Sequence, residues 1–164
     1  VRLIQASFHL AREELILTTP YFVPDEGTFD ALLTAAERGV RTVLVVPRRN
    51  DSRLVAAASR GLYEPLLESG VEIHEYTRGL LHAKTITVDR RLAIVSTANL
   101  DRRSFELNYE ASLVVYDANF ASLLCALQRS YLDAAVRIDP ADWARRRWPA
   151  KILHNAAGIL APIL

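Results

Sequence analysis

Two side chains that can act on a phosphate stand two positions apart in the segment 81–89, L-H-A-K-T-I-T-V-D. The segment is apolar and β-branched, which predicts a strand whose side chains alternate between the two faces of a sheet. His82 and Lys84 then project from one face, about 6.5 Å apart along the strand. An imidazole can attack phosphorus or transfer a proton near neutral pH, and an ammonium can neutralise a phosphate oxygen. The spacing therefore predicts a site for phosphodiester chemistry.

Asp89 ends the same segment and points to the opposite face of the predicted strand. It belongs to the same motif as His82 and Lys84, and we list it with the catalytic motif for that reason. Its orientation, however, favours a structural role over that of a second catalytic carboxylate.

The spacing of these three residues matches H-x-K-x-x-x-x-D, the motif of the phospholipase D superfamily. The continuation over residues 96–110, S-T-A-N-L-D-R-R-S-F-E-L-N-Y-E, resembles the G-S-x-N-x-D-x-R-S-x-x-L-N-x-E found in the bacterial cardiolipin synthase branch. Ser96 occupies the usual glycine position and Thr97 the usual serine, so a hydroxyl is kept. The stretch T-T-P-Y-F-V-P-D-E, residues 18–26, is similar to the same enzymes.

The resemblance implies a role for each matching residue. Lys84, Thr97 and Asn99 would hold the phosphate oxygens. Glu110 matches the family glutamate that hydrogen-bonds a catalytic histidine. Such enzymes pair two motifs: the histidine of one attacks phosphorus to form a phosphohistidine, and the other is the acid and base, the role that falls to His82. Lysines supply the positive charge, so the scheme needs no metal and no cofactor.

Tyr21 follows the predicted strand that Pro20 ends. Two interpretations stay open for it. It forms a wall of the active site, or it is a packed aromatic residue at the end of a strand.

Composition sets the class of protein. The chain has 164 residues, 51% of them hydrophobic and 24% charged, which is typical of one soluble globular domain with a real core. The net charge of +1 gives no global basic field, so we expect no nucleic-acid partner. The single Cys125 lies in an apolar helical stretch and is expected to be a buried, inert thiol.

Alternating helices and strands predict an α/β layered sandwich on a mixed parallel and antiparallel sheet. The first helix is expected over residues 2–14, with Leu3, Phe8 and Leu10 pointing inward. A hairpin over residues 82–96 and a last strand over residues 109–116 precede a helix that Asp117 caps. The other expected helices end near residues 38 and 69, and the other expected strands cover residues 16–20, 42–46 and 71–76.

We expect residues 1–164 to form one phospholipase D-like domain, the second half of a two-motif enzyme, with residues 140–164 as a C-terminal helical tail. The chain has no methionine and begins at Val1, which we interpret as a piece of a longer protein. The resemblance implies N-terminal membrane segments elsewhere in that protein and a location at the bacterial inner membrane. The tail carries Trp143 and Trp148 among arginines, a composition that fits either a membrane interface or packing on its own domain.

The function that the resemblance implies is phosphatidyl transfer, in which two phosphatidylglycerols are joined with release of glycerol. The implied partners are the phospholipid substrate, the membrane surface, and the N-terminal phospholipase D half or a second copy that completes the site. Two alternatives remain. One is a phospholipase D-type hydrolase or a one-motif homodimeric nuclease. The other is a non-catalytic docking or membrane-facing half.

Overall fold

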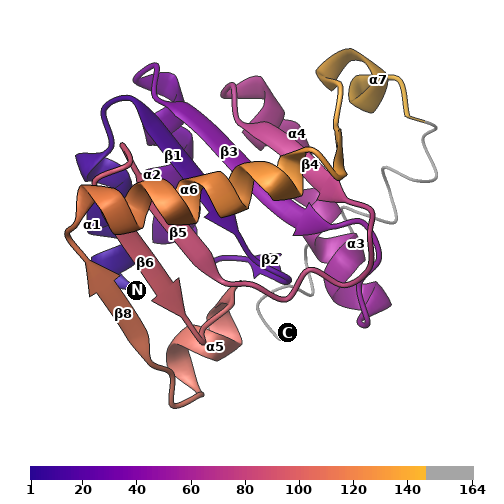
Figure 1. Ribbon diagram of the computed structural model, residues 1–164. Coiled ribbons are helices and arrows are strands. Elements are labelled where there is room, and N and C mark those ends of the chain that lie inside the picture. The colour runs from indigo at the N-terminus through magenta and orange to yellow at the C-terminus, as the bar shows by residue number, and fades with distance from the viewer. Residues whose placement is uncertain (147–164) are drawn as a thin grey trace.

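The computed structural model describes residues 1–146. Within this range a seven-stranded sheet forms the middle layer, and helices cover both of its faces (Figure 1). The strands are β1 (Glu14–Thr18), β2 (Phe22–Val23), β3 (Arg41–Pro47), β4 (Glu72–Tyr76), β5 (Thr85–Val88), β6 (Leu92–Ser96), β7 (Leu100–Asp101), β8 (Ser112–Val115) and β9 (Ala135–Arg137). The helices are α1 (Arg2–Leu10), α2 (Glu26–Glu37), α3 (Arg53–Gly61), α4 (Tyr63–Glu68), α5 (Arg102–Glu106), α6 (Ala118–Leu132) and α7 (Pro140–Ala144).

The sheet is mixed, with the strand order β8-β6-β5-β1-β3-β4-β9. Strands β1, β3 and β4 run parallel to one another, and β5, β6, β8 and β9 join by antiparallel pairs. A separate two-stranded pair joins β2 to β7. The predicted layered α/β sandwich on a mixed sheet is confirmed.

The central strands are apolar on both faces because both faces are covered. Leu15 and Leu17 of β1 face a core that α1, α2 and α4 cover, whereas Ile16 between them packs toward Cys125 of α6 on the other side (Figure 1). Cys125 is buried, as expected, and burial raises the pKa of its thiol. Helix α6 thus covers the face of the sheet opposite to α1, α2 and α4.

Short polar residues start most of the helices by accepting a backbone N–H from the first turn. Ser52 accepts from Val55 at the start of α3, and Asp117 accepts from Phe120 at the start of α6. The predicted cap by Asp117 is confirmed.

The first helix is shorter than predicted. It ends at Leu10, and the side chains of Leu3 and Leu10 are 46% and 60% exposed instead of inward. Ile4, Ser7 and Phe8 form its buried face. The helix stops because residues 12–14 have left helical geometry and give their backbone N–H groups to the carboxylate of Asp89.

The motif strand also starts later than predicted. β5 begins at Thr85, so His82 and Lys84 lie in the segment that leads into it. Thr85 pairs with Thr18, the last residue of β1, and Pro20 follows shortly after. Without a neighbouring strand on that side, the chain before Thr85 leaves the sheet.

The C-terminal part of the sheet differs from the sequence prediction in two respects. The strand predicted over residues 109–116 forms only over Ser112–Val115, and it is followed by β9, which pairs with the edge of β4. On α6, Phe120, Leu123 and Leu127 are exposed, while Ala121, Leu124, Cys125 and Gln128 are the buried residues.

The start of the predicted tail packs on its own domain. Trp143 of α7 contacts Tyr63 with 5.0 Å between ring centroids, and the guanidinium of Arg146 lies 3.6 Å from the centre of the Trp143 ring. The rest of the predicted tail lies outside the described residues. Among residues 1–146, no helix combines the length and apolar character needed to cross a membrane.

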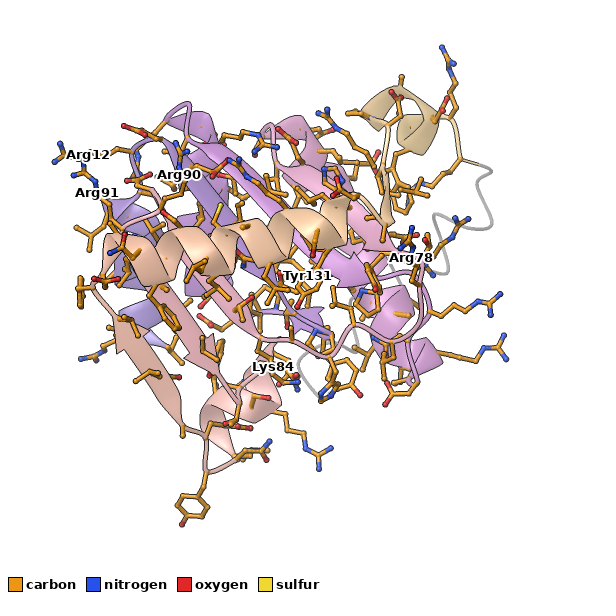
Figure 2. All side chains as sticks on the ribbon, viewed as in Figure 1. Arg12, Arg78, Lys84, Arg90, Arg91 and Tyr131 are labelled. Atoms are coloured by element: carbon orange, nitrogen blue, oxygen red, sulfur yellow. The ribbon has the colours of Figure 1, made fainter. Side chains whose placement is uncertain are left out.

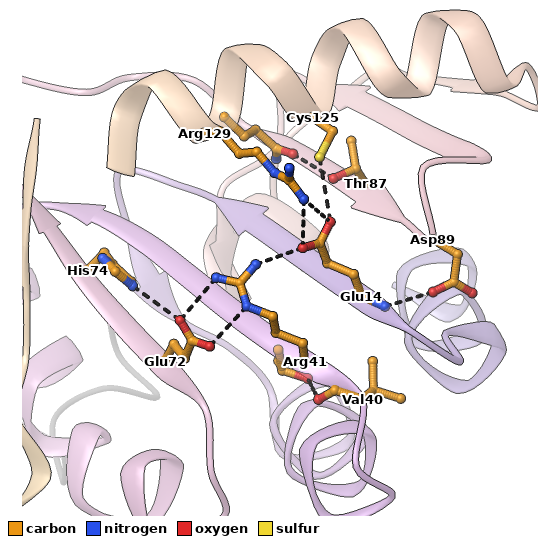
Figure 3. A network of polar contacts seen from close by, with 11 residues as sticks. Glu14, Val40, Arg41, Glu72, His74, Thr87, Asp89, Cys125 and Arg129 are labelled. Atoms are coloured by element: carbon orange, nitrogen blue, oxygen red, sulfur yellow. Dashed lines mark hydrogen bonds and ion pairs between the residues drawn. The ribbon is translucent and has the colours of Figure 1, made fainter. Parts of the chain in front are cut away.

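A chain of ion pairs lies on the α6 side of the sheet, around Glu14 (Figure 3). The Glu14 carboxylate accepts hydrogen bonds from Arg41 at 2.7 Å and from Arg129 of α6 at 3.1 Å. Arg41 also donates to Glu72, which lies 3.6 Å from His74. Burial alone raises the pKa of Glu14, but the hydrogen bonds and charges of the two arginines outweigh it and lower that pKa. The network thus ties β1, β3, β4 and α6 together through charge.

We predict that Glu14→Gln lowers the free energy of unfolding by about 1–2 kcal/mol at pH 7, because both arginines lose a charged acceptor. Since the folded-state pKa of Glu14 lies below its ordinary value of 4.5, the stabilisation is present above pH 4.5 and is lost as the pH falls through the folded pKa. The difference between the variant and the native chain should therefore shrink in acid. Urea unfolding across this pH range measures it.

Glu13→Gln is the matched control, since Glu13 is the exposed neighbour of Glu14. Equal stability of all three proteins at pH 7 would contradict the role given to the network.

Candidate active site

The residues of the predicted motif gather at one end of the sheet. Figure 2 shows Lys84 at the end where β5 begins, while Arg90 and Arg91 mark the β5–β6 hairpin at the opposite end. Loops that follow β1, β3 and β6 reach the same end as Lys84, because these strands all finish there.

His82 and Lys84 point toward each other. Lys84 Nζ lies 3.0 Å from His82 Nδ1, 3.3 Å from His82 Nε2 and 3.0 Å from the His82 backbone oxygen. An ammonium can only donate, so the shorter contact makes Nδ1 an acceptor, and we assign the ring proton to Nε2. The predicted same-side arrangement of the two groups is confirmed, although neither lies within the strand itself.

The surroundings of Lys84 lower the pKa of its ammonium through two opposing effects. Burial lowers the pKa of the half-buried ammonium, and the negative charges of Glu110 and Asp101 act in the opposite direction. The backbone oxygen of Lys84 accepts the N–H of Ser96, which fixes the lysine beside the start of the next loop. The side chain of His82, in contrast, is exposed.

Thr97 and Glu110 contact each other directly. The Thr97 hydroxyl donates to Glu110 and accepts the N–H of Ala111 at 3.0 Å. Glu110 also accepts from Asn108 at 3.2 Å. The side-chain hydrogen bonds of Glu110 thus run to Thr97 and Asn108. The predicted hydrogen bond between Glu110 and a histidine is not formed with His82. Glu110 is nevertheless close enough to Lys84 for its charge to act on the ammonium.

Asn99 is held by Ser104, the first-turn serine of α5. Its backbone N–H and its side-chain Nδ2 both lie 3.3 Å from Ser104 Oγ. Its Oδ1 is buried and has no hydrogen-bond partner among the described residues. Leaving a buried polar atom without a partner costs free energy, so the Asn99 amide is not fully satisfied in this orientation.

The serine at the usual glycine position is compatible with the fold because it lies in β6. Ser96 Oγ lies 2.8 Å from Ser112 Oγ on the neighbouring strand and accepts the N–H of Ala98 at 3.0 Å. The side chain therefore ties β6 to β8 and shapes the turn that carries Thr97 toward the site.

Tyr21 lies beside His82. The two rings meet edge to face, with 6.5 Å between centroids and an interplanar angle of 88°. The Tyr21 hydroxyl donates to both carboxylate oxygens of Asp51, at 2.7 and 2.8 Å. Of the two interpretations left open by the sequence, this position agrees with a wall of the site.

Asp89 lies at the far end of β5 from His82, seven residues of nearly extended chain away, or about 23 Å. Its carboxylate accepts the backbone N–H groups of Arg12, Glu13 and Glu14 at 2.8–3.0 Å. Figure 3 shows the bond from Glu14. The motif aspartate thus anchors the start of β1 to the hairpin, and it does not reach the reacting group.

Comparison with known proteins supports the same family. Residues 4–128 match the family model described as cardiolipin synthase, PLD-like domain. The chain belongs to this family. It is 44% identical to cardiolipin synthase A of Serratia proteamaculans over 154 residues, and 42% identical to that of Buchnera aphidicola from Schizaphis graminum over 158 residues. These matches cover 94% and 96% of the chain but 32% of each relative, so the chain spans about a third of their length.

Two solved structures share the fold of this phospholipase D-like domain. The phospholipase D family member Nuc from Salmonella typhimurium matches with a TM-score of 0.74 at 17% identity, over 84% of this chain and 89% of that one. Phosphatidylserine synthase from Haemophilus influenzae matches with a TM-score of 0.75 at 20% identity, over 99% of this chain and 44% of that one. At these identities the likeness establishes the fold.

Two acidic residues of the domain were missed in the sequence. Asp51 holds Tyr21, and the buried Asp101 caps α5 and lies close enough to Lys84 to act on its pKa. Asp51 follows β3, whose carboxyl end meets that of β1 because the two strands are parallel neighbours. That rule places residues 48–52 and residue 21 at one edge of the sheet and was a usable signal for Asp51.

Among residues 1–146, no cluster of three or more His, Cys, Asp or Glu side chains is arranged to hold a metal ion. Lys84 supplies a positive charge directly beside His82.

We predict that Asp89→Ala lowers the free energy of unfolding by about 2–4 kcal/mol, because three backbone N–H groups lose a charged acceptor. Asp89 also has a φ of 50°, a conformation that asparagine tolerates better than alanine. Asp89→Asn keeps one acceptor oxygen and should lose clearly less. Urea unfolding of the three proteins tests the order, and an unchanged stability of the alanine variant would refute the anchoring role.

Proposed function

We propose that this chain is the C-terminal catalytic half of a cardiolipin synthase, a phosphatidyltransferase that joins two phosphatidylglycerols and releases glycerol. The observation that carries the proposal is the 3.0 Å contact between Lys84 Nζ and His82 Nδ1 at the open end of the sheet, in a chain of the cardiolipin synthase family. An exposed imidazole beside a half-buried ammonium suits a ligand that brings its own negative charge, such as a phosphodiester.

The reaction needs two histidines, and this chain supplies one at the site. A histidine of the other half attacks phosphorus, so that a P–N bond forms and the P–O bond to glycerol breaks. His82 takes up a proton at Nδ1 when Lys84 turns to the phosphate, and the resulting imidazolium gives its Nε2 proton to the departing glycerol oxygen. The neutral imidazole then takes the proton of the primary hydroxyl of a second phosphatidylglycerol. The oxygen of that hydroxyl attacks phosphorus, the P–N bond breaks, and cardiolipin forms.

The neutral tautomer assigned to His82 is the form that precedes the acid. Nδ1 accepts from Lys84 and takes up a proton when the ammonium turns away, and the resulting imidazolium can donate from Nε2. Lys84 can turn from the imidazole to a phosphate oxygen, because an ammonium prefers an anion to a neutral ring nitrogen.

Thr97 and Asn99 are proposed to hold the phosphate oxygens with Lys84. Rotating the Asn99 amide by 180° lets Oδ1 accept from the Ser104 hydroxyl and frees the NH₂ group as a donor. The Thr97 hydroxyl is bound to Glu110 and becomes a phosphate donor when Glu110 turns toward a histidine. We propose that this turn accompanies substrate binding and gives Glu110 its predicted partner.

We infer that the whole enzyme works at the bacterial inner membrane, where its phospholipid substrates lie, and that this domain is peripheral there. The segments that anchor it would belong to the two thirds of the relatives that this chain does not match.

We predict that His82→Ala lowers cardiolipin formation by the full-length enzyme by about a hundred- to ten-thousandfold, the usual range for loss of a general acid and base. Because His82 is exposed, the melting temperature should stay within a few degrees of the native value. The assay follows labelled phosphatidylglycerol into cardiolipin and phosphatidic acid. Full transferase activity of the variant contradicts the proposal, and phosphatidic acid as the main product of the native enzyme indicates a hydrolase.

The other half of the enzyme needs a surface next to the site, and the α6 side of the sheet offers one. Cys125 and Arg129 of α6 face Glu14, at the sheet end opposite to Lys84 (Figures 1 and 3). At 100° per residue, Leu123 and Leu127 lie on the side of α6 away from Cys125 and Arg129, which is the side toward the site. These side chains are 72% and 47% exposed.

The open sheet surface below that flank is apolar too. Val95 and Leu113 pair across β6 and β8, and they share their face with Ala93, which packs under α6. Both are exposed, and each lies next to one of the serines that hydrogen-bond at the site end, Ser96 and Ser112. We name Val95, Leu113, Phe120, Leu123 and Leu127 the apolar corner, and we propose that the N-terminal phospholipase D half docks there.

We predict that Leu123→Glu prevents the chain from co-purifying with the remainder of the enzyme when the two are produced as separate tagged pieces. A buried glutamate in the interface has no partner, so capture should fall at least tenfold. Leu10→Glu is the matched control, because Leu10 is an exposed leucine on α1 across the sheet.

Equal capture of both variants, or equal loss, would place the other half elsewhere. Light scattering of the chain alone shows whether a second copy takes the same surface, and Leu123→Glu should then also abolish that dimer.

A further inference from the structure

Tyr21 connects the general acid to a carboxylate that the reaction scheme does not use. On one side its ring meets the His82 ring edge to face at 6.5 Å, and on the other its hydroxyl donates to Asp51 at 2.7 Å. Asp51, Tyr21 and His82 come from three different loops, which follow β3, follow β1 and precede β5. The three side chains therefore form a row that ends at the reacting imidazole.

The Asp51 loop and the Tyr21 loop are fixed to each other and to the fold. Asn50 Nδ2 donates to the backbone oxygen of Pro20 at 2.8 Å, so the Asp51 loop is joined to the Tyr21 loop by a second bond. The buried Thr19 donates to the Tyr21 backbone oxygen at 2.8 Å and accepts the N–H of Leu100 at 3.2 Å. The Tyr21 backbone is thus held between the loop after β3 and the strand that follows Asn99.

The ionisation states of the pair keep the bond formed at neutral pH. Burial raises the pKa of Tyr21 to about 12, with further contributions from the hydrogen bond to Asp51 and from the charges of Asp51 and Asp101, so the phenol remains a donor. The hydrogen bond from Tyr21 lowers the pKa of Asp51, and the charge of His82 adds to the lowering. A phenol donating to a carboxylate is a charge-assisted bond, which is short and directional.

His82 needs a support of this kind. It is exposed and lies before the strand, so no ladder of backbone bonds holds it. Its contact with Lys84 is given up when the ammonium turns to a phosphate. Glu110, which the resemblance assigned as its carboxylate, is bonded to Thr97 and Asn108 and turns toward a histidine only in the step proposed above. The ring of Tyr21 remains as a fixed surface against the imidazole.

We propose that Asp51 is a positioning residue for His82 and acts through Tyr21, by holding the phenol ring against the imidazole that transfers the proton. The effect on activity rests on the function proposed above for His82, whereas the contact between the Tyr21 and His82 rings does not depend on it. Asp51 contacts neither the imidazole nor, in this scheme, the substrate. Its removal should therefore lower kcat and leave KM for phosphatidylglycerol nearly unchanged.

Three variants of the full-length enzyme test the route through Tyr21. Asp51→Ala and Tyr21→Phe each break the bond and should lower kcat about tenfold, with KM within twofold. Asp51→Asn keeps an acceptor oxygen for the phenol and should retain more than a third of kcat. The double variant Tyr21→Phe with Asp51→Ala should be no worse than either single variant, because both remove one contact.

Asp30→Ala and Tyr116→Phe are matched controls, since both residues are exposed and lie outside the loops that carry the site. Additive losses in the double variant, a rise in KM without a fall in kcat, or native activity of Asp51→Ala would each overturn the proposal.

A second measurement is independent of lipid chemistry. The imidazole signals of His82 in this chain, assigned by their loss in His82→Ala, should shift in Asp51→Ala and Tyr21→Phe but not in the two controls, because the tyrosine ring is released. Unchanged signals overturn the positioning role. If the full-length enzyme makes no cardiolipin while the signals shift as expected, the proposed function fails and the geometric link from Asp51 to His82 stands.

Discussion

The hydrogen-bonded ladders on both sides of β5 are the constraint on which the site depends. β5 pairs with β1 and β6, and the β1 ladder stops at Thr85 because β1 itself ends at Thr18. His82 and Lys84 therefore lie in a segment that joins the sheet at Thr85 and is itself outside the sheet. Such a segment can present two side chains to an external phosphate, whereas within β5 all four side chains are buried and neither group would reach one.

The opposite end of β5 supplies the rigidity. Asp89 binds three backbone N–H groups at the start of β1, and Glu14 in the same segment is paired with Arg41 and Arg129. Both sets of bonds lie at the sheet end away from Lys84 (Figures 2 and 3). The phospholipase D motif thus spans a working end and an anchoring end of one strand, which explains why its aspartate is spaced so far from its histidine.

The sequence predicted the layered fold, the motif residues and their common direction, because these follow from alternation and from a long motif. It misplaced the start of β5 and the inward positions of α1, since strand ends and helix faces are decided by partners far away in the chain. Phe120, Leu123 and Leu127 of α6 are exposed, and they leave the apolar corner beside the site. Asp51 was missed as a site residue because its importance depends on two parallel strands ending side by side.

We propose that His82 and Lys84 act together on one phosphate, opposite a histidine that lies outside this chain. A crystal structure of the full-length enzyme with vanadate bound would test this arrangement. We expect one vanadate with His82 Nε2 on one side, a histidine of the N-terminal half on the other, and Lys84 within hydrogen-bond distance of an equatorial oxygen. A vanadate bound away from His82, or held by His82 and Lys84 with no second histidine facing it, would contradict it.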